Sequence, residues 1–227
     1  MVKKTNLISS PYSAVTEYED EFVKSYNVNL SKAVAEVLKY MANATAFALK
    51  NGITFTKAVE DDLSAAEAEV KLNPTEAEIK AGNYKKGHVM IQGFDITIEN
   101  PKGSERSGVD GNGKKWSIKM NNTYGYIKGT NGKDGDHIDV FLGDSLESNK
   151  VFVIDQYLNN VFDEHKVMLG FDNVKEARAA YLANYEKGWK GLKRITRTTT
   201  ETFSKWIGEK TKKQKPFHQY KIAKDGI

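Results

Sequence analysis

The segment Tyr124–Val140 reads YGYIKGTNGKDGDHIDV and combines a glycine-rich loop with three acidic side chains. Asp134, Asp136 and Asp139 lie within six positions of one another. Carboxylates this close repel one another in water, so such a cluster is usually held together by a hard divalent cation. The segment therefore predicts a Mg²⁺-type site with oxygen ligands and room for water and phosphate. The alternative is a polar turn in which the acids cap the backbone and form a salt bridge.

The residues around this loop predict a β-rich domain. Short apolar runs bounded by glycine, proline and asparagine recur along residues 88–169, a pattern typical of strands joined by tight turns. Many short strands with tight turns favour a small antiparallel barrel, so the expected fold class is α+β. The expected strands are Val89–Ile91, Phe94–Ile98, Trp116–Met120, Tyr124–Ile127, Ile138–Leu142, Lys150–Tyr157 and Val161–Leu169.

Helical patterns precede and follow this β region. Apolar residues at three- and four-residue steps predict a helix over residues 30–50, and an alanine- and glutamate-rich stretch predicts a second over 57–71. The apolar face of the first helix is narrow, so we expect it to dock on the main domain, on a second copy or on another protein. Further helices are expected over residues 76–80, 173–187 and 199–208.

These patterns divide the chain into three parts. We expect an N-terminal helical extension over residues 1–71, a main domain over 72–210 and a basic tail over 211–227. From Gly188 to Ile227 there are eleven Lys and Arg against three Asp and Glu, so with a net charge of +4 the rest of the chain carries about −4. The tail could touch nucleic acid, but a solvated terminus is the simpler interpretation, and we do not expect nucleic-acid binding.

The composition excludes several classes of site. The chain has 227 residues and no cysteine, which excludes disulfides, thiolate metal sites and cysteine nucleophiles. Phosphate-binding P-loop, nucleophile-elbow and dinucleotide motifs are missing, and no two histidines stand four apart on a predicted helix. No apolar run is long enough to span a bilayer and no signal peptide is evident, so we expect a cytoplasmic protein without membrane contact.

Further charged side chains near strand ends suit a phosphorylated substrate. Glu99 ends one expected strand, Asp155 lies on another, and Asp163 and Glu164 precede Lys166 on the next. Acids that bind metal, together with cations that neutralise phosphate, are the groups that phosphoryl chemistry requires. Each of these residues could instead be an ordinary surface charge. The basic residues that could neutralise a polyanion are Lys102, Arg106, Lys114, Lys115 and Lys166.

Four segments together resemble the family I soluble inorganic pyrophosphatases. The Tyr-Gly-Tyr and Asp-x-Asp-x-x-Asp pattern of Tyr124–Val140 is similar to the signature of that family. Ile98–Ser104 resembles its Glu-x-Pro segment, Asp163–Lys166 its acid-x-Lys strand, and Asn184–Trp189 its tyrosine-bearing helix. Residues 72–210 look most like the pyrophosphatase-like domain of bacteriophage and mobile-element proteins, which suggests a phage origin.

The resemblance implies a fold, a reaction and a role for each matching residue. It implies a five-stranded, OB-like barrel with flanking helices and Mg²⁺-dependent hydrolysis of pyrophosphate, with Mn²⁺ as a second choice of metal. Asp136 would orient or deprotonate the attacking water. The implied metal ligands are Asp134, Asp139, an acid from the Asp163–Glu164 pair and, through water, Glu99. The groups implied to hold phosphate and assist catalysis are Arg106, Tyr124, Lys166, Tyr185 and, as a candidate, Lys115.

The sequence departs from the family pattern at several positions. His137 stands where the family usually has a proline, and Glu186 where it has a lysine beside the helix tyrosine. Lys114 and Lys115 are the candidates for an upstream basic residue, and Asp155 is the candidate for a further strand-end aspartate. These departures bear on turnover and substrate range rather than on metal binding.

Functions of different classes are compatible with these features. One is hydrolysis of pyrophosphate or a related phosphoanhydride. The alternative is a phage virion or packaged protein that retains the fold with little or no activity, and the N-terminal extension motivates it. A nucleic-acid-associated factor would use the basic tail. The expected partners are a phosphorylated small molecule, phage structural proteins bound through the N-terminal helices, and a second copy of the chain. The expected location is the host cytoplasm or the virion.

Overall fold

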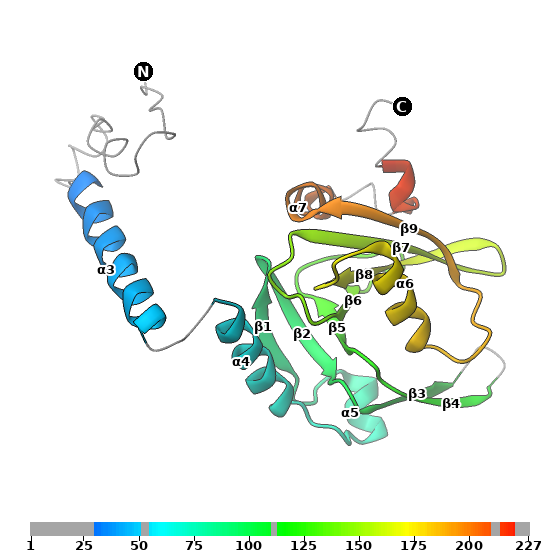
Figure 1. The fold of residues 1–227 in the computed structure, drawn as a ribbon. Coiled ribbons are helices and arrows are strands. Elements are labelled where there is room, and N and C mark those ends of the chain that lie inside the picture. The colour runs from blue at the N-terminus through cyan, green and yellow to red at the C-terminus, as the bar shows by residue number, and fades with distance from the viewer. Residues whose placement is uncertain (1–29, 51–54, 110–112, 210–213, 221–227) are drawn as a thin grey trace. The chain divides into compact units, whose positions relative to one another are not determined.

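The computed structural model describes residues 30–50, 55–109, 113–209 and 214–220 (Figure 1). The chain divides into two compact units, Met1–Phe55 and Thr56–Ile227. In the first unit, helix α3 (Leu30–Lys50) covers the helical range that the sequence predicted. Residues 1–29 of the predicted N-terminal extension lie outside the described residues. No described helix is both long enough and apolar enough to cross a bilayer.

The second unit is built on a seven-stranded sheet with the order β1-β2-β5-β6-β8-β7-β9. Neighbouring strands are antiparallel except β6 and β8, which run parallel. The strands are β1 (Gly87–Ile91), β2 (Phe94–Asn100), β5 (Thr123–Ile127), β6 (Ile138–Leu142), β7 (Lys150–Leu158), β8 (Val161–Leu169) and β9 (Leu192–Thr199). Strands β3 (Glu105–Val109) and β4 (Lys115–Lys119) form a separate two-stranded ribbon. The predicted α+β class with a mostly antiparallel sheet is confirmed.

The sheet is not closed into the small five-stranded barrel that we expected. Within the described residues, no pairing joins the outer strands β1 and β9. The sequence interpretation missed β9, which pairs along β7 from Lys150↔Thr199 to Gln156↔Leu192. Its sequence, LKRITRTT, is β-branched but polar, as is typical of an edge strand with one face in water. Helices cover the sheet, so its apolar side chains are buried without closure.

The strands bury apolar side chains on both faces of the sheet, which explains continuous apolar runs such as Ile138–Leu142. Successive side chains of a strand point to opposite faces. Val140 accordingly joins one core cluster and Phe141 the other. We call these the α7 face and the α6 face. The first is covered by α4 (Phe55–Ala68) and α7 (Thr200–Gly208), and the second by α6 (Val174–Ala183).

Two findings concern the predicted domain limits. Ala66 of α4 packs in the core of the second unit, so by packing this helix belongs with the sheet. The domain limits 1–71, 72–210 and 211–227 stay predictions.

The predicted solvated tail is wrong for residues 214–220. Phe217 and Tyr220 are buried on the α7 face, and Phe217 packs edge-on against Trp206 with ring centroids 5.0 Å apart. Their apolar surface outweighs the basic character of the surrounding residues.

Helix α5 (Glu76–Ala81) connects α4 to the sheet and has strong end signals. Thr75 and Glu78 form a reciprocal capping box at its start. Gly82 ends it with a φ of 65°, a left-handed conformation that glycine adopts without a steric penalty. The short helix predicted over residues 76–80 is therefore confirmed. Helix α6 ends earlier than predicted, so Tyr185 lies just beyond it.

Candidate active site

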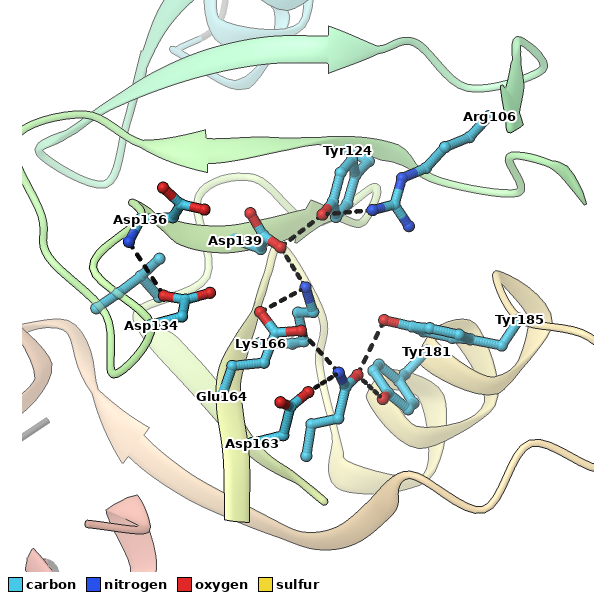
Figure 2. A network of polar contacts seen from close by, with 12 residues as sticks. Arg106, Tyr124, Asp134, Asp136, Asp139, Asp163, Glu164, Lys166, Tyr181 and Tyr185 are labelled. Carbon is cyan, nitrogen blue, oxygen red and sulfur yellow. Dashed lines mark hydrogen bonds and ion pairs between the residues drawn. The ribbon is translucent and has the colours of Figure 1, made fainter. Parts of the chain in front are cut away.

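The centre of the candidate site is an ion-pair network on the α6 face of the sheet (Figure 2). Asp139 of β6 lies beside Lys166 of β8 in the parallel register. The Lys166 ammonium contacts the Asp139 carboxylate and lies 2.8 Å from Oε2 of Glu164. Although burial by itself lowers the pKa of Lys166, Asp139 and its neighbours raise it well above the usual value. A buried, charged ammonium therefore stands between two carboxylates.

Tyr124 connects this network to Arg106. The Tyr124 hydroxyl donates to Oδ2 of Asp139 at 2.5 Å and accepts from Nη2 of Arg106 at 3.1 Å. Burial raises the pKa of Tyr124, so its hydroxyl keeps the proton. The Arg106 guanidinium also lies over the rings of Tyr124 and Trp116, 4.3 and 5.5 Å from their centroids. In the described part of the chain, no carboxylate lies within ion-pair distance of it, so its charge is available to an anion.

A β-bulge brings Asp163 and Glu164 to the same neighbour. Gln156 of β7 is opposite Glu164, but Tyr157 is opposite Phe162, so Asp163 is the extra residue of β8. The Gln156 Nε2 donates to Oδ2 of Asp163 at 3.1 Å and to Oε1 of Glu164 at 2.7 Å. Both acids of the predicted pair therefore reach one amide, and Glu164 contacts Lys166 in addition.

The other end of the Gln156 amide binds two tyrosines. Its Oε1 accepts from the hydroxyls of Tyr181 at 2.6 Å and Tyr185 at 3.1 Å. Trp189 stacks on Tyr185 with ring centroids 4.7 Å apart and donates from Nε1 to the Tyr181 hydroxyl. Burial raises the pKa of Tyr185 to about 12, so it remains a neutral donor near neutral pH. In Figure 2, Tyr185, Lys166 and Arg106 surround one common region.

The acidic loop lies beside this network and is held mainly by its own backbone. Oδ1 of Asp134 accepts a hydrogen bond from the backbone N–H of Asp136 at 3.1 Å. This contact corresponds to the polar turn that the sequence allowed as the alternative to a metal site. Both carboxylates are exposed, and Figure 2 shows them on the loop that leads to Asp139. His137 stacks on Tyr126 with centroids 4.7 Å apart, and its Nδ1 lies 2.6 Å from the Thr130 carbonyl. His137, which stands where the family usually has a proline, thus anchors the loop to β5.

Two predicted residues lie apart from the network. Glu99 forms an ion pair with Lys86 at 2.8 Å and accepts from the Tyr84 hydroxyl at 3.3 Å. Lys115 is exposed and lies opposite Val109, three residues along the ribbon from Arg106. Among the described residues, no hydrogen bond or ion pair links either one to Asp139.

Asp155 is not a further acid of this site, because it points to the α7 face. It is fully buried, and its carboxylate accepts from the N–H of Phe217 at 2.6 Å. The neighbouring Gln156 takes the position that faces the site. Sequence reasoning missed Gln156 because a neutral amide belongs to none of the charge motifs. The available signal was strand alternation. Gln156 follows Phe152 and Ile154 at alternate positions, and both of these point to the α6 face, so Gln156 is expected to point there as well.

The donor set suits a hard divalent cation, since it consists of carboxylate oxygens in a chain without cysteine. In the parts of the chain that the structure describes, however, no three Asp, Glu or His side chains gather closely enough to hold an ion. The Lys166 ammonium instead lies between Asp139 and Glu164, one positive charge against two carboxylates. The residues fit such a cation by the type of their oxygen donors, while Asp139 and Glu164 share the Lys166 ammonium as their partner.

Comparisons with known proteins place the chain in a family. Curated proteins yield no sequence match. Similar solved structures include inorganic pyrophosphatases from Coxiella burnetii (15% identity, TM-score 0.26, 50% of this chain and 89% of that one) and Neisseria gonorrhoeae (17%, 0.28, 50% and 87%). At these TM-scores the structures add nothing to the assignment. The family model described as Inorganic Pyrophosphatase matches residues 76–208, more than half of the chain. The chain therefore belongs to the inorganic pyrophosphatase family and is a hydrolase of that type.

Proposed function

We propose that the chain hydrolyses inorganic pyrophosphate, or a related phosphoanhydride, to phosphate with the help of Mg²⁺ or Mn²⁺. The observation that carries the proposal is the continuous series of contacts Arg106–Tyr124–Asp139–Lys166–Glu164. It brings two cations and two carboxylates from three strands, β3, β6 and β8, to one region. Cleavage of a phosphoanhydride needs both kinds of group, because cations neutralise phosphate oxygens and carboxylates hold metal ions or accept protons.

The metal-binding role is proposed for the carboxylates around this region. When bound, a divalent cation lowers the pKa of water and screens the negative charge of the phosphates. Support for this role comes from Asp139 and Glu164, whose carboxylates approach each other on either side of the Lys166 ammonium. The residues that would hold the metal are Asp134, Asp139, Asp163, Glu164 and, through water, Glu99.

The remaining residues would bind pyrophosphate and move one proton. Asp136, exposed on the loop, accepts a proton from the attacking water. The water oxygen bonds to one phosphorus atom as the bridging P–O bond breaks, which leaves two phosphates. Arg106 and Lys166 neutralise phosphate oxygens. Tyr124 and Tyr185 donate hydrogen bonds from hydroxyls that burial keeps protonated. Lys115, on the exposed part of the ribbon, is proposed as an outlying contact.

Phosphate release from pyrophosphate by the full chain tests this proposal, measured colorimetrically with Mg²⁺, Mn²⁺ or Co²⁺. Asp136→Asn should lower the rate by about 10²-fold or more, since a positioned general base contributes roughly 10²–10⁴-fold. Asp144→Asn is the matched control, because this acid is 92% exposed and pairs with Lys102 outside the network. Absence of release with all three metals would contradict the proposal and favour a virion or packaged protein that retains the fold.

The other inferences from the resemblance stay predictions. They are the phage origin, binding of phage structural proteins or a second copy through the N-terminal helices, and a location in the host cytoplasm or the virion. Copurification with capsids would support the virion assignment, and it is compatible with catalytic activity.

A further inference from the structure

A cavity of about 620 Å³ is lined by Arg106, which belongs to the candidate active site, and by Glu99. Its other walls include residues 71–74 and Ile79 of α5. This volume falls within the usual range of small-molecule sites, roughly 300–1,000 Å³. Pyrophosphate would fill only a small part of it. The cavity therefore has room for a group larger than the phosphates.

Arg106 supplies positive charge to this cavity. As described above, its guanidinium contacts the Tyr124 hydroxyl and two aromatic rings, and no carboxylate of the described residues pairs with it. The planar fork of a guanidinium binds phosphate with two parallel hydrogen bonds. Of its charged neighbours in the cavity wall, Glu99 pairs with Lys86 and Lys71 with Glu78, while Glu105 accepts a hydrogen bond from the neutral hydroxyl of Ser117. An anion would therefore bind at Arg106.

Leu72 and Ile79 give the same cavity an apolar part. Their side chains are 57% and 58% exposed, although both are aliphatic. The ion pair of Lys71 with Glu78 and the capping box of α5 hold these two residues in place. Asn73 and Asn100 also line the cavity, and asparagine amides can donate and accept hydrogen bonds. Such a lining suits a flat organic ring with polar edges.

We propose that this cavity binds the organic group of a phosphoanhydride substrate, so that the chain accepts nucleoside polyphosphates as well as pyrophosphate. The inference rests on the proposed hydrolysis of phosphoanhydrides. The phosphates bind at Arg106, where the cavity meets the ion-pair network, and the nucleoside lies against Leu72 and Ile79. Water attacks one phosphorus atom, Asp136 takes its proton, and the bridging oxygen leaves with the other phosphate, so ADP yields AMP and phosphate.

Isothermal titration calorimetry of the full chain with ADP and with pyrophosphate, in Mg²⁺, tests the assignment. The parent should bind both compounds. In the double variant Leu72→Asp/Ile79→Asp, the affinity for ADP relative to pyrophosphate should fall at least about tenfold, because only ADP loses an apolar contact with its nucleoside. Met90→Asp is the matched control: Met90 is 60% exposed on β1 and does not line the cavity. It should leave the ratio of the two affinities unchanged.

Phosphate release, measured in the same samples, separates this inference from the proposed function. If the parent binds and hydrolyses pyrophosphate but does not bind ADP, the cavity assignment is wrong and the proposed function stands. The assignment is also wrong if the double variant leaves the affinity ratio unchanged. If ADP binds and the ratio shifts, but neither compound releases phosphate, the cavity assignment stands and the proposed hydrolysis fails.

Discussion

Two aspartates on opposite faces of one sheet have different kinds of partner. Asp139, on the α6 face, is contacted by side chains, the Lys166 ammonium and the Tyr124 hydroxyl, and its own side chain is 19% exposed. Asp155, on the α7 face, is fully buried. Its carboxylate accepts hydrogen bonds from the backbone N–H groups of Phe217 and His218 and from the His218 ring. Side-chain partners at an open surface can be exchanged for a ligand, whereas backbone partners in a packed segment cannot. The first aspartate is therefore suited to chemistry and the second to stability.

The largest expected effect is the loss of activity in Asp139→Asn. The substitution removes the negative charge that contacts Lys166 and that we propose to bind metal. We expect kcat/KM for pyrophosphate to fall by about 10²-fold or more, as is typical when a charged group of the reaction centre is lost. Phosphate release with Mg²⁺ gives the rate, and circular dichroism checks that the fold is retained. Unchanged activity in a folded variant would contradict the role given to the α6 face.

Asp155→Asn should show the opposite behaviour, with lower stability and retained activity. An amide offers one acceptor oxygen, so a backbone donor of the C-terminal segment loses its partner. The free energy of unfolding should fall by about 1–3 kcal/mol. Urea denaturation measures this change, with the exposed Asp144→Asn as the control. If Asp155→Asn instead lost activity per folded molecule without losing stability, the contrast between the two faces would fail.

Gln156→Glu sharpens the comparison, because it adds a third carboxylate beside Asp163 and Glu164. Without metal, loss of the amide donor and repulsion between like charges should lower stability by about 1 kcal/mol. Added Mg²⁺ should then raise the melting temperature more than in the parent, since a cation that binds only the folded state stabilises it. Thermal melts with and without Mg²⁺ measure both effects. Gln219→Glu, at an exposed position, is the control, and an equal Mg²⁺ response in the parent and Gln156→Glu would argue against a cation at these acids.

The smallest effect is a dependence of stability on pH that arises from Asp155. Burial raises its pKa above the ordinary 3.8, although hydrogen bonds from His218 and Phe217 oppose the shift. The folded protein then binds the proton more tightly than the unfolded chain. The stability contributed by this group is therefore complete below the unfolded pKa and is lost as the pH rises through the folded pKa. The amide of an asparagine side chain does not titrate, so the Asp155→Asn variant lacks this dependence.

The difference in unfolding free energy between the parent and Asp155→Asn should accordingly be larger near about pH 3 than near about pH 7. Urea denaturation at both values measures it. The same two proteins compared in a His218→Gln background test the effect without the imidazole ring that contacts Asp155. A difference that grows with rising pH would mean that the hydrogen-bond donors outweigh burial and lower the pKa of Asp155.

Local patterns predicted the helices and most strands well, because each depends on spacing within a short segment. The apolar steps of residues 30–50 are an example. The strand β9 was missed because its polar, β-branched residues gain their stability from pairing with β7. The closed barrel was wrong for a related reason: alternation predicts strands, but only long-range pairing decides whether the outer ones meet. The buried position of Phe217 likewise depends on a distant partner, Trp206.

For the candidate site, residue type and spacing alone determined the acidic loop, the acid-x-Lys strand and the kind of chemistry to expect. Tertiary structure decided which of these residues meet. The parallel register placed Asp139 beside Lys166, the bulge brought Asp163 and Glu164 to Gln156, and strand parity turned Asp155 to the opposite face. The physical reason is that a side chain's charge is a local property. The face to which it points, and the partner it finds there, depend on the pairing of strands far apart in the chain.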